Sequence, residues 1–312
     1  MARKLIIDLD PGIGDAVAAV LAMLDPEVDL LALTATAGCV SGRVATRNLH
    51  GIVAQVDPAK WPRIGAGDVA STAEHTSSFR RTLEALNGPT GLGDLEIVAP
   101  ELHHRHESSK VMLDIVRAHP YQVTLLTLGP LGNVAAACER APDFLSLLGG
   151  FVCLGGSIAV GGDITAAAET NMSLDPESAR SVLASPEAKT LVPLDTTNAA
   201  MITYENFNRL SVGSARATLF LKQLLPFYFR AHHQVLGVEG IWLREVVALA
   251  AVVRPDLFRL QPLRVDVEVQ GELTRGMTVF DRRPQSSGNS NTAVALDVDS
   301  QAVVDYMTQL LR

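Results

Sequence analysis

One stretch near the start of the chain, residues 4–18, constrains the fold more than any other. It opens with a short apolar run, residues 5–7, of the kind that forms a buried strand. Pro11 and Gly12 then force a turn, and an unbroken series of alanine and larger aliphatic residues up to Leu24 predicts a buried helix. A strand, a tight turn and a buried helix make the first half of a βαβ unit, so this stretch favours an α/β fold.

Three acidic residues, Asp8, Asp10 and Asp15, surround this strand-to-helix turn. In an open α/β sheet such a turn lies at the carboxyl edge of the strands, where ligands bind. Crowded carboxylates repel one another, and a bound cation that prefers hard oxygen ligands, calcium or magnesium, relieves that repulsion. A favourable charge at a helix N-terminus is an alternative explanation for Asp15, but it does not account for Asp8 and Asp10.

Strand-like and helix-like segments alternate along the first two thirds of the chain. The predicted strands are residues 28–36, 63–65, 123–128, 151–154 and 190–192, and the predicted helices are residues 41–56, 108–117, 131–140 and 176–183. The last third adds helices at 215–229 and 242–253, strands at 265–269, 277–281 and 292–296, and a final helix capped by Ser300. Residues 67–104 and 157–174 are expected to be loops. This order predicts one domain over residues 1–312, a doubly wound, mostly parallel sheet with helices on both faces.

Composition narrows the class of protein. The 312 residues are 47% hydrophobic, which is ample for a large core, and the net charge of −8 disfavours nucleic acid and anionic membranes as partners. No apolar run reaches membrane-spanning length, and the N-terminus enters a strand without a recognisable signal peptide. The three cysteines, Cys39, Cys138 and Cys153, lie in apolar surroundings and predict free thiols in a reducing compartment. We therefore expect a cytoplasmic protein.

Residues 8–16, DLDPGIGDA, resemble the signature D-x-D-P-G-x-D-D-A of the inosine–uridine preferring nucleoside hydrolase family. Residues 128–133, 155–171, 175–179 and 244–248 resemble further motifs of that family in the same order, so the resemblance spans nearly the whole chain. It implies the family's α/β fold and hydrolysis of the N-glycosidic bond of a nucleoside or related N-riboside. It also implies a small-molecule substrate, with neither nucleic acid nor membrane as partner, and a homodimer or homotetramer.

The same resemblance implies a calcium site. Its ligands would be the side chains of Asp10, Asp15 and Glu245 and the backbone carbonyl of Leu128, with Asp8 supporting them from behind. A metal there would orient and acidify a water, and Asp10 would take the water's proton as general base. The attack on the anomeric carbon would pass through an oxocarbenium-like transition state. A salt bridge to Arg244 or another neighbour is the alternative explanation for Glu245.

Six further residues are implied to contact the substrate, namely Asn87, Asp163, Glu169, Asn171, Trp242 and Arg244. Glu169 and Asn171 would hold the 5′ side of the sugar, or merely stabilise their loop. Trp242 would stack on the base, or belong to the core. Arg244 stays protonated and so is no general acid, but it can pair with a phosphate or stabilise an anionic leaving group. His232 and His233 are possible acids, although adjacent histidines more often comprise one packed and one exposed ring.

The chain departs from the family pattern at several of these positions. Gly14 replaces an aspartate that binds the ribose hydroxyls and Cys39 replaces an asparagine beside them, while Asn87, Asp163, Arg244 and Glu245 replace histidine, asparagine, histidine and aspartate. These changes leave a second hypothesis open, a catalytically weakened or inactive nucleoside- or sugar-binding homologue. A third reading takes Asp8 and Asp10 as the nucleophile pair of a haloacid-dehalogenase-like phosphatase. That class also needs a downstream lysine and a later acidic pair, which the chain lacks in suitable register.

Overall fold

The predicted first strand and helix lie at the centre of the fold. In the computed structural model, which describes residues 2–67, 77–97, 106–209, 216–283, 290 and 292–311, β1 (Arg3–Leu9) leads through Asp10, Pro11 and Gly12 into α1 (Ile13–Leu24). Alternate residues of β1 enter opposite cores: Ile7 and Leu9 belong to the cluster on one face of the sheet and Ile6 to the cluster on the other. A strand buried on both faces needs a continuous apolar run, which explains the sequence of β1.

Within the described residues, nine strands form one sheet in the order β10-β9-β11-β6-β5-β4-β1-β2-β3. The seven strands that run parallel are β3 (Arg63–Gly65), β2 (Val28–Ala35), β1, β4 (Val123–Thr127), β5 (Gly150–Leu154), β6 (Lys189–Val192) and β11 (Thr292–Val298). β9 (Phe258–Val267) and β10 (Thr278–Asp281) add an antiparallel edge. This arrangement confirms the predicted doubly wound, mostly parallel sheet.

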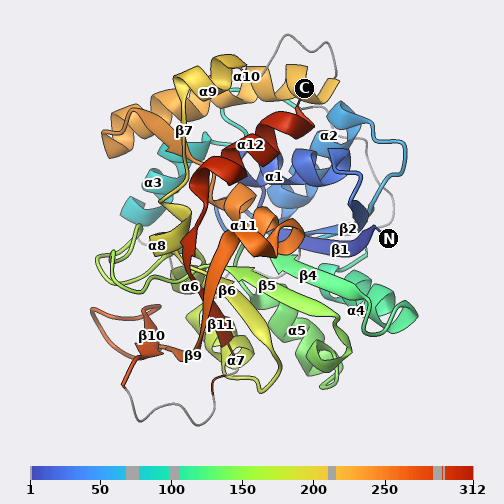
Figure 1. Ribbon diagram of the computed structural model, residues 1–312, viewed down its shortest axis with the longest axis vertical. Helices are drawn as coiled ribbons and strands as arrows, with labels where there is room; N and C mark the ends of the chain where they lie inside the picture. Colours follow the sequence, from blue (N-terminus) through green and yellow to red (C-terminus); the bar gives the residue numbers. More distant parts are fainter. Residues whose placement is uncertain are drawn as a thin grey trace.

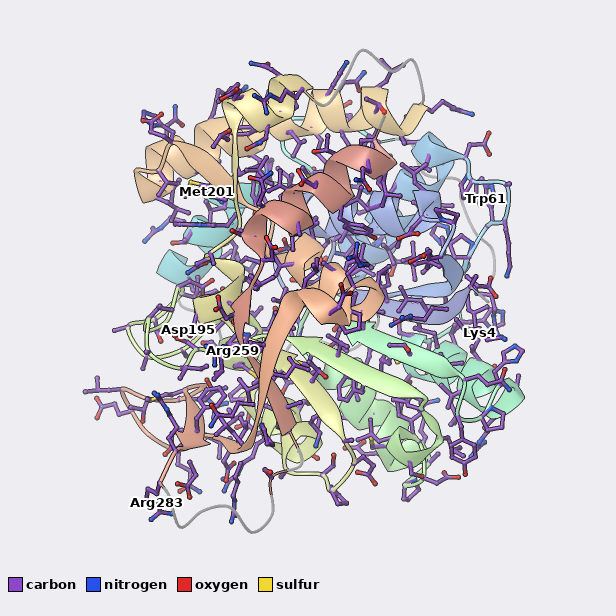
Figure 2. The ribbon with its side chains drawn as sticks, viewed as in Figure 1. Lys4, Trp61, Asp195, Met201, Arg259 and Arg283 are labelled. Carbon is purple, nitrogen blue, oxygen red and sulfur yellow. The ribbon has the colours of Figure 1, made fainter. Side chains whose placement is uncertain are left out.

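Helices cover both faces of this sheet (Figure 1). One face carries α1, α2 (Gly42–Val56), α10 (Arg216–Ala231), α11 (Arg244–Val253) and α12 (Ser300–Leu310). The other carries α4 (Ser108–Ala118), α5 (Gly132–Arg140) and α7 (Pro176–Leu183). Figure 2 shows Trp61 near the β3 end of the sheet and Arg283 beyond β10 at the opposite end. Among the described residues, no helix combines the length and apolar character needed to span a bilayer.

Smaller elements lie at the sheet's edges and in its connections. They are α3 (Ser77–Asn87), α6 (Thr170–Leu174), α8 (Leu194–Thr197), β7 (Met201–Thr203), α9 (Tyr204–Arg209) and β8 (Gly240–Trp242), with short helical turns at Leu145–Leu147, His232–Leu236 and Pro255–Leu257. β7 and β8 pair as a separate antiparallel ribbon.

The strand order places a topological switch point between β1 and β4. The chain moves from β1 outward to β2 and β3, and then returns to the other side of β1 as β4. A crevice opens outside the carboxyl ends of the strands at such a point, and ligands bind there. Asp10 directly follows β1 and Leu128 directly follows β4, so both residues border this crevice.

Four local predictions were wrong. The expected loop 67–104 contains α3, whose Phe79 and Leu83 pack inward; residues 68–76 and 98–104 lie outside the described part of the chain. The expected loop 157–174 ends in α6, because the Glu169 carboxylate caps that helix. Trp242 ends a strand rather than starting a helix, since it pairs with Met201. The cap of the last helix is the Asp299 side chain, not Ser300.

Candidate active site

Asp10, which borders the switch-point crevice, is held in place by Cys39, a residue that follows the neighbouring strand β2. The backbone N–H of Cys39 donates to Asp10 Oδ2 at 2.6 Å, and the Cys39 thiol donates to the backbone carbonyl of Asp10 at 2.6 Å. A Cβ on Gly38 would lie 2.0 Å from Asp10 Oδ2, so glycine is needed there. Burial raises the pKa of Asp10 to about 7.

Asp8 lies in β1, two residues before Asp10, and is not among the described residues that line the cavity. Its Oδ1 accepts hydrogen bonds from the Thr34 hydroxyl at 2.7 Å and the Asn133 side-chain amide at 2.8 Å. The same Asn133 amide donates to the carbonyl of Ala35 at 2.7 Å. Asp8 thus joins β1, β2 and the start of α5. Burial raises its pKa to about 7.

Two helix N-termini bring Asp15 and Glu245 to the crevice. Asp15 is the third residue of α1 and Glu245 the second of α11, and the two helices pack against each other. Both N-termini favour negative charge. The N–H of Gly12 donates to Asp15 Oδ2 at 3.1 Å, so helix capping accounts for one oxygen of Asp15 but not for the other. Asp15 Oδ1 and Glu245 Oε2 are buried and have no hydrogen-bond partner among the described residues.

The crevice carries more negative charge than its surroundings balance. Burial, with repulsion from neighbouring acids, raises the pKa of Asp15, and burial raises the pKa of Glu245. Among the described residues that line the cavity, Arg244 is the sole permanent cation. Buried oxygen atoms without donors are costly unless a cation or hydroxyl pairs with them. Carboxylate and carbonyl oxygens are the donor set that calcium prefers, so the residues present fit that ion.

The acids do not form a closed cluster. In the part of the chain that the structure describes, no three His, Cys, Asp or Glu side chains are grouped closely enough to hold a metal ion by themselves. The Leu128 carbonyl, the fourth predicted ligand, lines the same cavity and accepts a hydrogen bond from the Asn171 side chain at 2.7 Å. A calcium ion would therefore have to draw these oxygens together. The calcium site stays a prediction, supported by the unpaired oxygens.

Arg244 and Asp163, which both line the cavity, form an ion pair. The Asp163 side chain also accepts from the N–H and hydroxyl of Thr170, at 2.9 and 3.0 Å. Arg244 Nε donates to Asn198 Oδ1 at 3.1 Å, and its guanidinium lies 5.7 Å from the ring centre of Trp242. The pair joins the loop after β5 to the start of α11. Arg244 pairs with Asp163, and Glu245 forms no ion pair with any described residue, so the salt-bridge alternative for Glu245 is wrong.

Glu169 and Asn171 hold the loop after β5 against the strand ends. The Glu169 carboxylate accepts from the N–H groups of Gly156, Asn171 and Met172 at 3.0, 3.0 and 3.2 Å. The Asn171 amide donates to the carbonyls of Leu128 and Leu154. The loop-stabilising role considered for these residues is thus present, and both also line the cavity. Burial and the nearby Asp163 raise the pKa of Glu169 to about 8.

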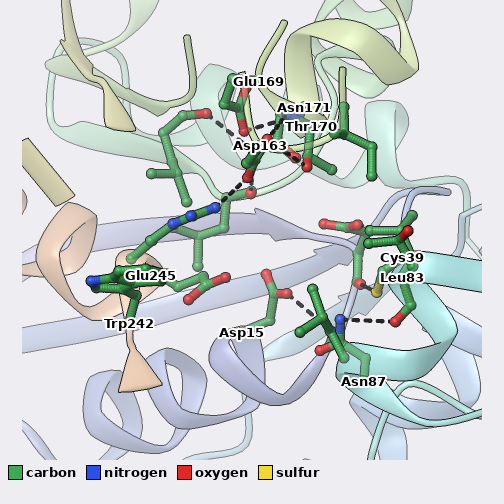
Figure 3. A pocket seen from close by; sticks show the side chains of 18 of the residues that line it. Asp15, Cys39, Leu83, Asn87, Asp163, Glu169, Thr170, Asn171, Trp242 and Glu245 are labelled. Atoms are coloured by element: carbon green, nitrogen blue, oxygen red, sulfur yellow. Dashed lines mark hydrogen bonds and ion pairs between the residues drawn. The ribbon is translucent and has the colours of Figure 1, made fainter. Parts of the chain in front are cut away.

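Asn87, at the end of α3, lines the cavity and caps α1. Its Oδ1 accepts from the N–H of Ile13 at 3.0 Å. Trp242 lines the opposite wall and donates through Nε1 to the carbonyl of Asn198 at 3.1 Å. Figure 3 shows Asn87 and Trp242 on either side of Asp15 and Glu245. All six residues predicted to contact substrate therefore surround one cavity.

Of the two adjacent histidines, one ring is packed and the other is exposed, as the alternative interpretation predicted. His233 is largely exposed and pairs with Glu239, while His232 is buried in the cavity wall. The Tyr228 carbonyl can only accept, so the bond of 3.1 Å to His232 Nδ1 places a proton on that nitrogen. Burial lowers the pKa of His232 to about 4, which makes the ring neutral near pH 7.

Sequence reasoning missed several residues of the cavity wall. Tyr228 lines it beside His232, and Leu83, Leu86, Ile164 and Leu236 give it apolar surface. Asn198 orients both Arg244 and Trp242. No motif marks Tyr228 or Asn198 in the sequence. Asn133, which holds Asp8, does lie in one of the matched motifs, so its position could have drawn attention to it.

Comparisons with known proteins agree with this fold and identify the family. Residues 5–305 match the model of the family described as inosine-uridine preferring nucleoside hydrolase. The chain is 33% identical to uridine nucleosidase 1 of Arabidopsis thaliana, over 98% of this chain and 92% of the relative. It is 32% identical to the inosine-uridine preferring nucleoside hydrolase of Leishmania major, over 96% and 94%. The purine-preferring ribonucleoside hydrolase of Gardnerella vaginalis superposes with a TM-score of 0.91 at 27% identity, covering 99% of this chain and 98% of that structure. The chain is therefore a divergent member of the inosine-uridine preferring nucleoside hydrolase family, and thus an N-glycosyl hydrolase that cleaves nucleosides.

Proposed function

We propose that the enzyme is a calcium-dependent hydrolase of ribonucleosides or related N-ribosides, with Asp10 as its general base. The observation that carries this proposal is the group of buried acids at the switch point. Within the described part of the chain, Asp15 Oδ1 and Glu245 Oε2 have no hydrogen-bond partner there, and the cation beside them, Arg244, pairs with Asp163. Calcium, when bound by Asp10, Asp15, Glu245 and the Leu128 carbonyl, would orient and acidify the attacking water.

Several polar residues of the cavity have a part in the proposed reaction. Asp10 would accept a proton from the water while the water's oxygen bonds to the anomeric carbon. The carbon–nitrogen bond would then break, and its electrons would pass to the departing nucleobase. Glu169, Asn171 and Asp163 line the side of the cavity where the sugar would lie. Trp242 and Asn87 lie on opposite walls and would contact the base and the sugar. Arg244 keeps its proton, so it would stabilise the departing base by donating hydrogen bonds.

The first experiment combines metal analysis with turnover. The protein is purified with calcium, its bound metal is measured, and base release is followed from inosine, uridine, adenosine, cytidine and their 2′-deoxy forms. Calcium-dependent release of base from a ribonucleoside is the expected result. Nucleoside binding without turnover would contradict the proposal and indicate a binding protein instead.

Calcium affinity is expected to rise as pH increases from about 6 to 8. Burial raises the pKa of the proposed ligand Asp10 from 3.8 to about 7, and it also raises the pKa values of the proposed ligands Asp15 and Glu245. Burial raises the pKa values of two further acids of the site, Asp8 and Glu169, to about 7 and about 8. Calcium binds the deprotonated acids and so releases their protons. Isothermal titration calorimetry in buffers of different ionisation enthalpy measures both quantities. An affinity independent of pH in this range would contradict the proposed ligands.

The same pKa shifts predict how the calcium-free protein responds to pH. Because the folded state holds protons that the unfolded chain has already released, stability falls as pH rises from about 4 to about 8. Each such proton contributes about 1.4 kcal/mol per pH unit. Thermal unfolding in excess chelator, measured from pH 5 to 8, tests this direction.

The proposal also covers the compartment and the oligomeric state of the enzyme. We extend the proposal to a cytoplasmic homodimer or homotetramer formed by one domain over residues 1–312. The free thiols of Cys39, Cys138 and Cys153 support a reducing compartment. Sedimentation of the purified protein tests the oligomeric state.

A further inference from the structure

The side chain of Glu245 occupies the space that a side chain at position 14 would need. A Cβ built on Gly14 would lie 2.0 Å from Glu245 Oε2, 2.4 Å from Cδ and 2.7 Å from Oε1. The whole carboxyl group of Glu245 thus occupies the space of a side chain at position 14. Contacts under 3.0 Å are essentially never made by a real Cβ, so the two positions cannot both carry these groups without displacement.

The geometry of the two helices explains this overlap. Gly14 and Glu245 are each the second residue of their helices, α1 and α11, which pack against each other. A glutamate extends its carboxylate about 1.5 Å farther than an aspartate. Without a side chain at position 14, that longer reach has a place to end, next to the start of α1 and within the wall of the cavity.

The position reached by Glu245 has chemical consequences. Glu245 Oε2 is buried and no described residue hydrogen-bonds to it, and the same holds for Oδ1 of Asp15, the residue that follows Gly14. Both residues line the same cavity, and Figure 3 shows their side chains next to each other. Gly14 therefore leaves room for one more unpaired carboxylate oxygen beside Asp15.

We propose that Gly14 is a positioning residue that lets Glu245 place its carboxylate beside Asp15, so that positions 14 and 245 work as one unit. This inference rests on the proposed calcium-dependent function. It means that the two departures from the family pattern, glycine for aspartate at 14 and glutamate for aspartate at 245, compensate each other in volume. The carboxylate that is missing at position 14 is then replaced by the carboxylate of Glu245.

The test compares Gly14→Ala, Glu245→Asp and the double variant. Gly14→Ala should weaken calcium binding about 10–100-fold, the range for residues that orient metal ligands. In the Glu245→Asp background, where the carboxylate is withdrawn, the same alanine should cost nothing. Gly14→Ala is expected to fold, because alanine favours a helix more than glycine does.

A matched glycine controls for the substitution itself. A Cβ on Gly150, the first residue of β5, would approach no atom nearer than 3.3 Å, so Gly150→Ala should bind calcium as the parent does. Isothermal titration calorimetry with calcium chloride gives the affinities. An equal loss from Gly14→Ala in both backgrounds, or no loss in either, would overturn the inference.

A readout free of metal separates this inference from the proposed function. In a calcium-free crystal structure of Gly14→Ala, the Glu245 carboxylate should be displaced by about 1 Å or more from its parental position. A parent protein that binds no calcium would defeat the metal proposal, while this displacement would still show the coupling of the two residues. An undisturbed Glu245 beside Ala at position 14 would refute the coupling itself.

Discussion

An Asp10→Asn variant is expected to lose about 10²–10⁴-fold in kcat, the contribution typical of a general base. The amide has the shape of the carboxylate, so its oxygen can still accept the hydrogen bond that the Cys39 N–H donates at 2.6 Å. What it lacks is the ability to take a proton, and the charge that would hold calcium. Initial rates of base release at saturating calcium measure the loss.

A buried aspartate outside the cavity provides the control. Asp25, which follows α1, accepts hydrogen bonds from the Tyr306 hydroxyl at 2.7 Å and from the N–H of Glu27 at 2.8 Å, away from the cavity. Asp25→Asn should change stability but leave kcat near that of the parent. If Asp10→Asn kept its rate within about tenfold of the parent, Asp10 would not be the base.

The centre of the fold was predictable because its signals are local. The apolar run of β1, the turn at Pro11 and Gly12 and the aliphatic helix that follows are contiguous, and each follows from chain sterics and burial. Asp10 and Asp15 are attached to this unit, so their meeting at the sheet edge was predictable too. Two of the helices that were missed, α3 and α6, depend on contacts outside their own segments or on a side-chain cap.

The rest of the site depends on contacts between distant parts of the chain. Glu245 was placed beside Asp15 only through its register in a family motif. The ion pair of Arg244 with Asp163 joins residues 81 positions apart, and nothing in either local sequence indicates it. The packing of α11 on α1 brings Glu245 against Gly14, which appears in the sequence only as a missing carboxylate.

Calcium removal is expected to abolish turnover and to lower the melting temperature. A ligand at about 100 times its dissociation constant stabilises the folded state by about 2.7 kcal/mol, which corresponds to several degrees in a chain of this size. Excess chelator should therefore reduce base release to background, and calcium should restore it. Differential scanning calorimetry with chelator or with calcium gives the shift. Full activity in chelator would contradict the mechanism.

Asp15→Asn distinguishes calcium bound at this site from calcium bound elsewhere. The amide oxygen can still accept the hydrogen bond from the Gly12 N–H, so the start of α1 keeps its cap. The substitution removes one of the mutually repelling buried acids, and so the metal-free variant should melt at or above the parent's temperature. The calcium-dependent rise in melting temperature and the turnover should both disappear, because the variant lacks one of the proposed calcium ligands. Acids buried for ion binding lower the stability of the metal-free protein, which is a common trade of stability for function. A calcium-dependent rise as large as the parent's would place the ion at another site.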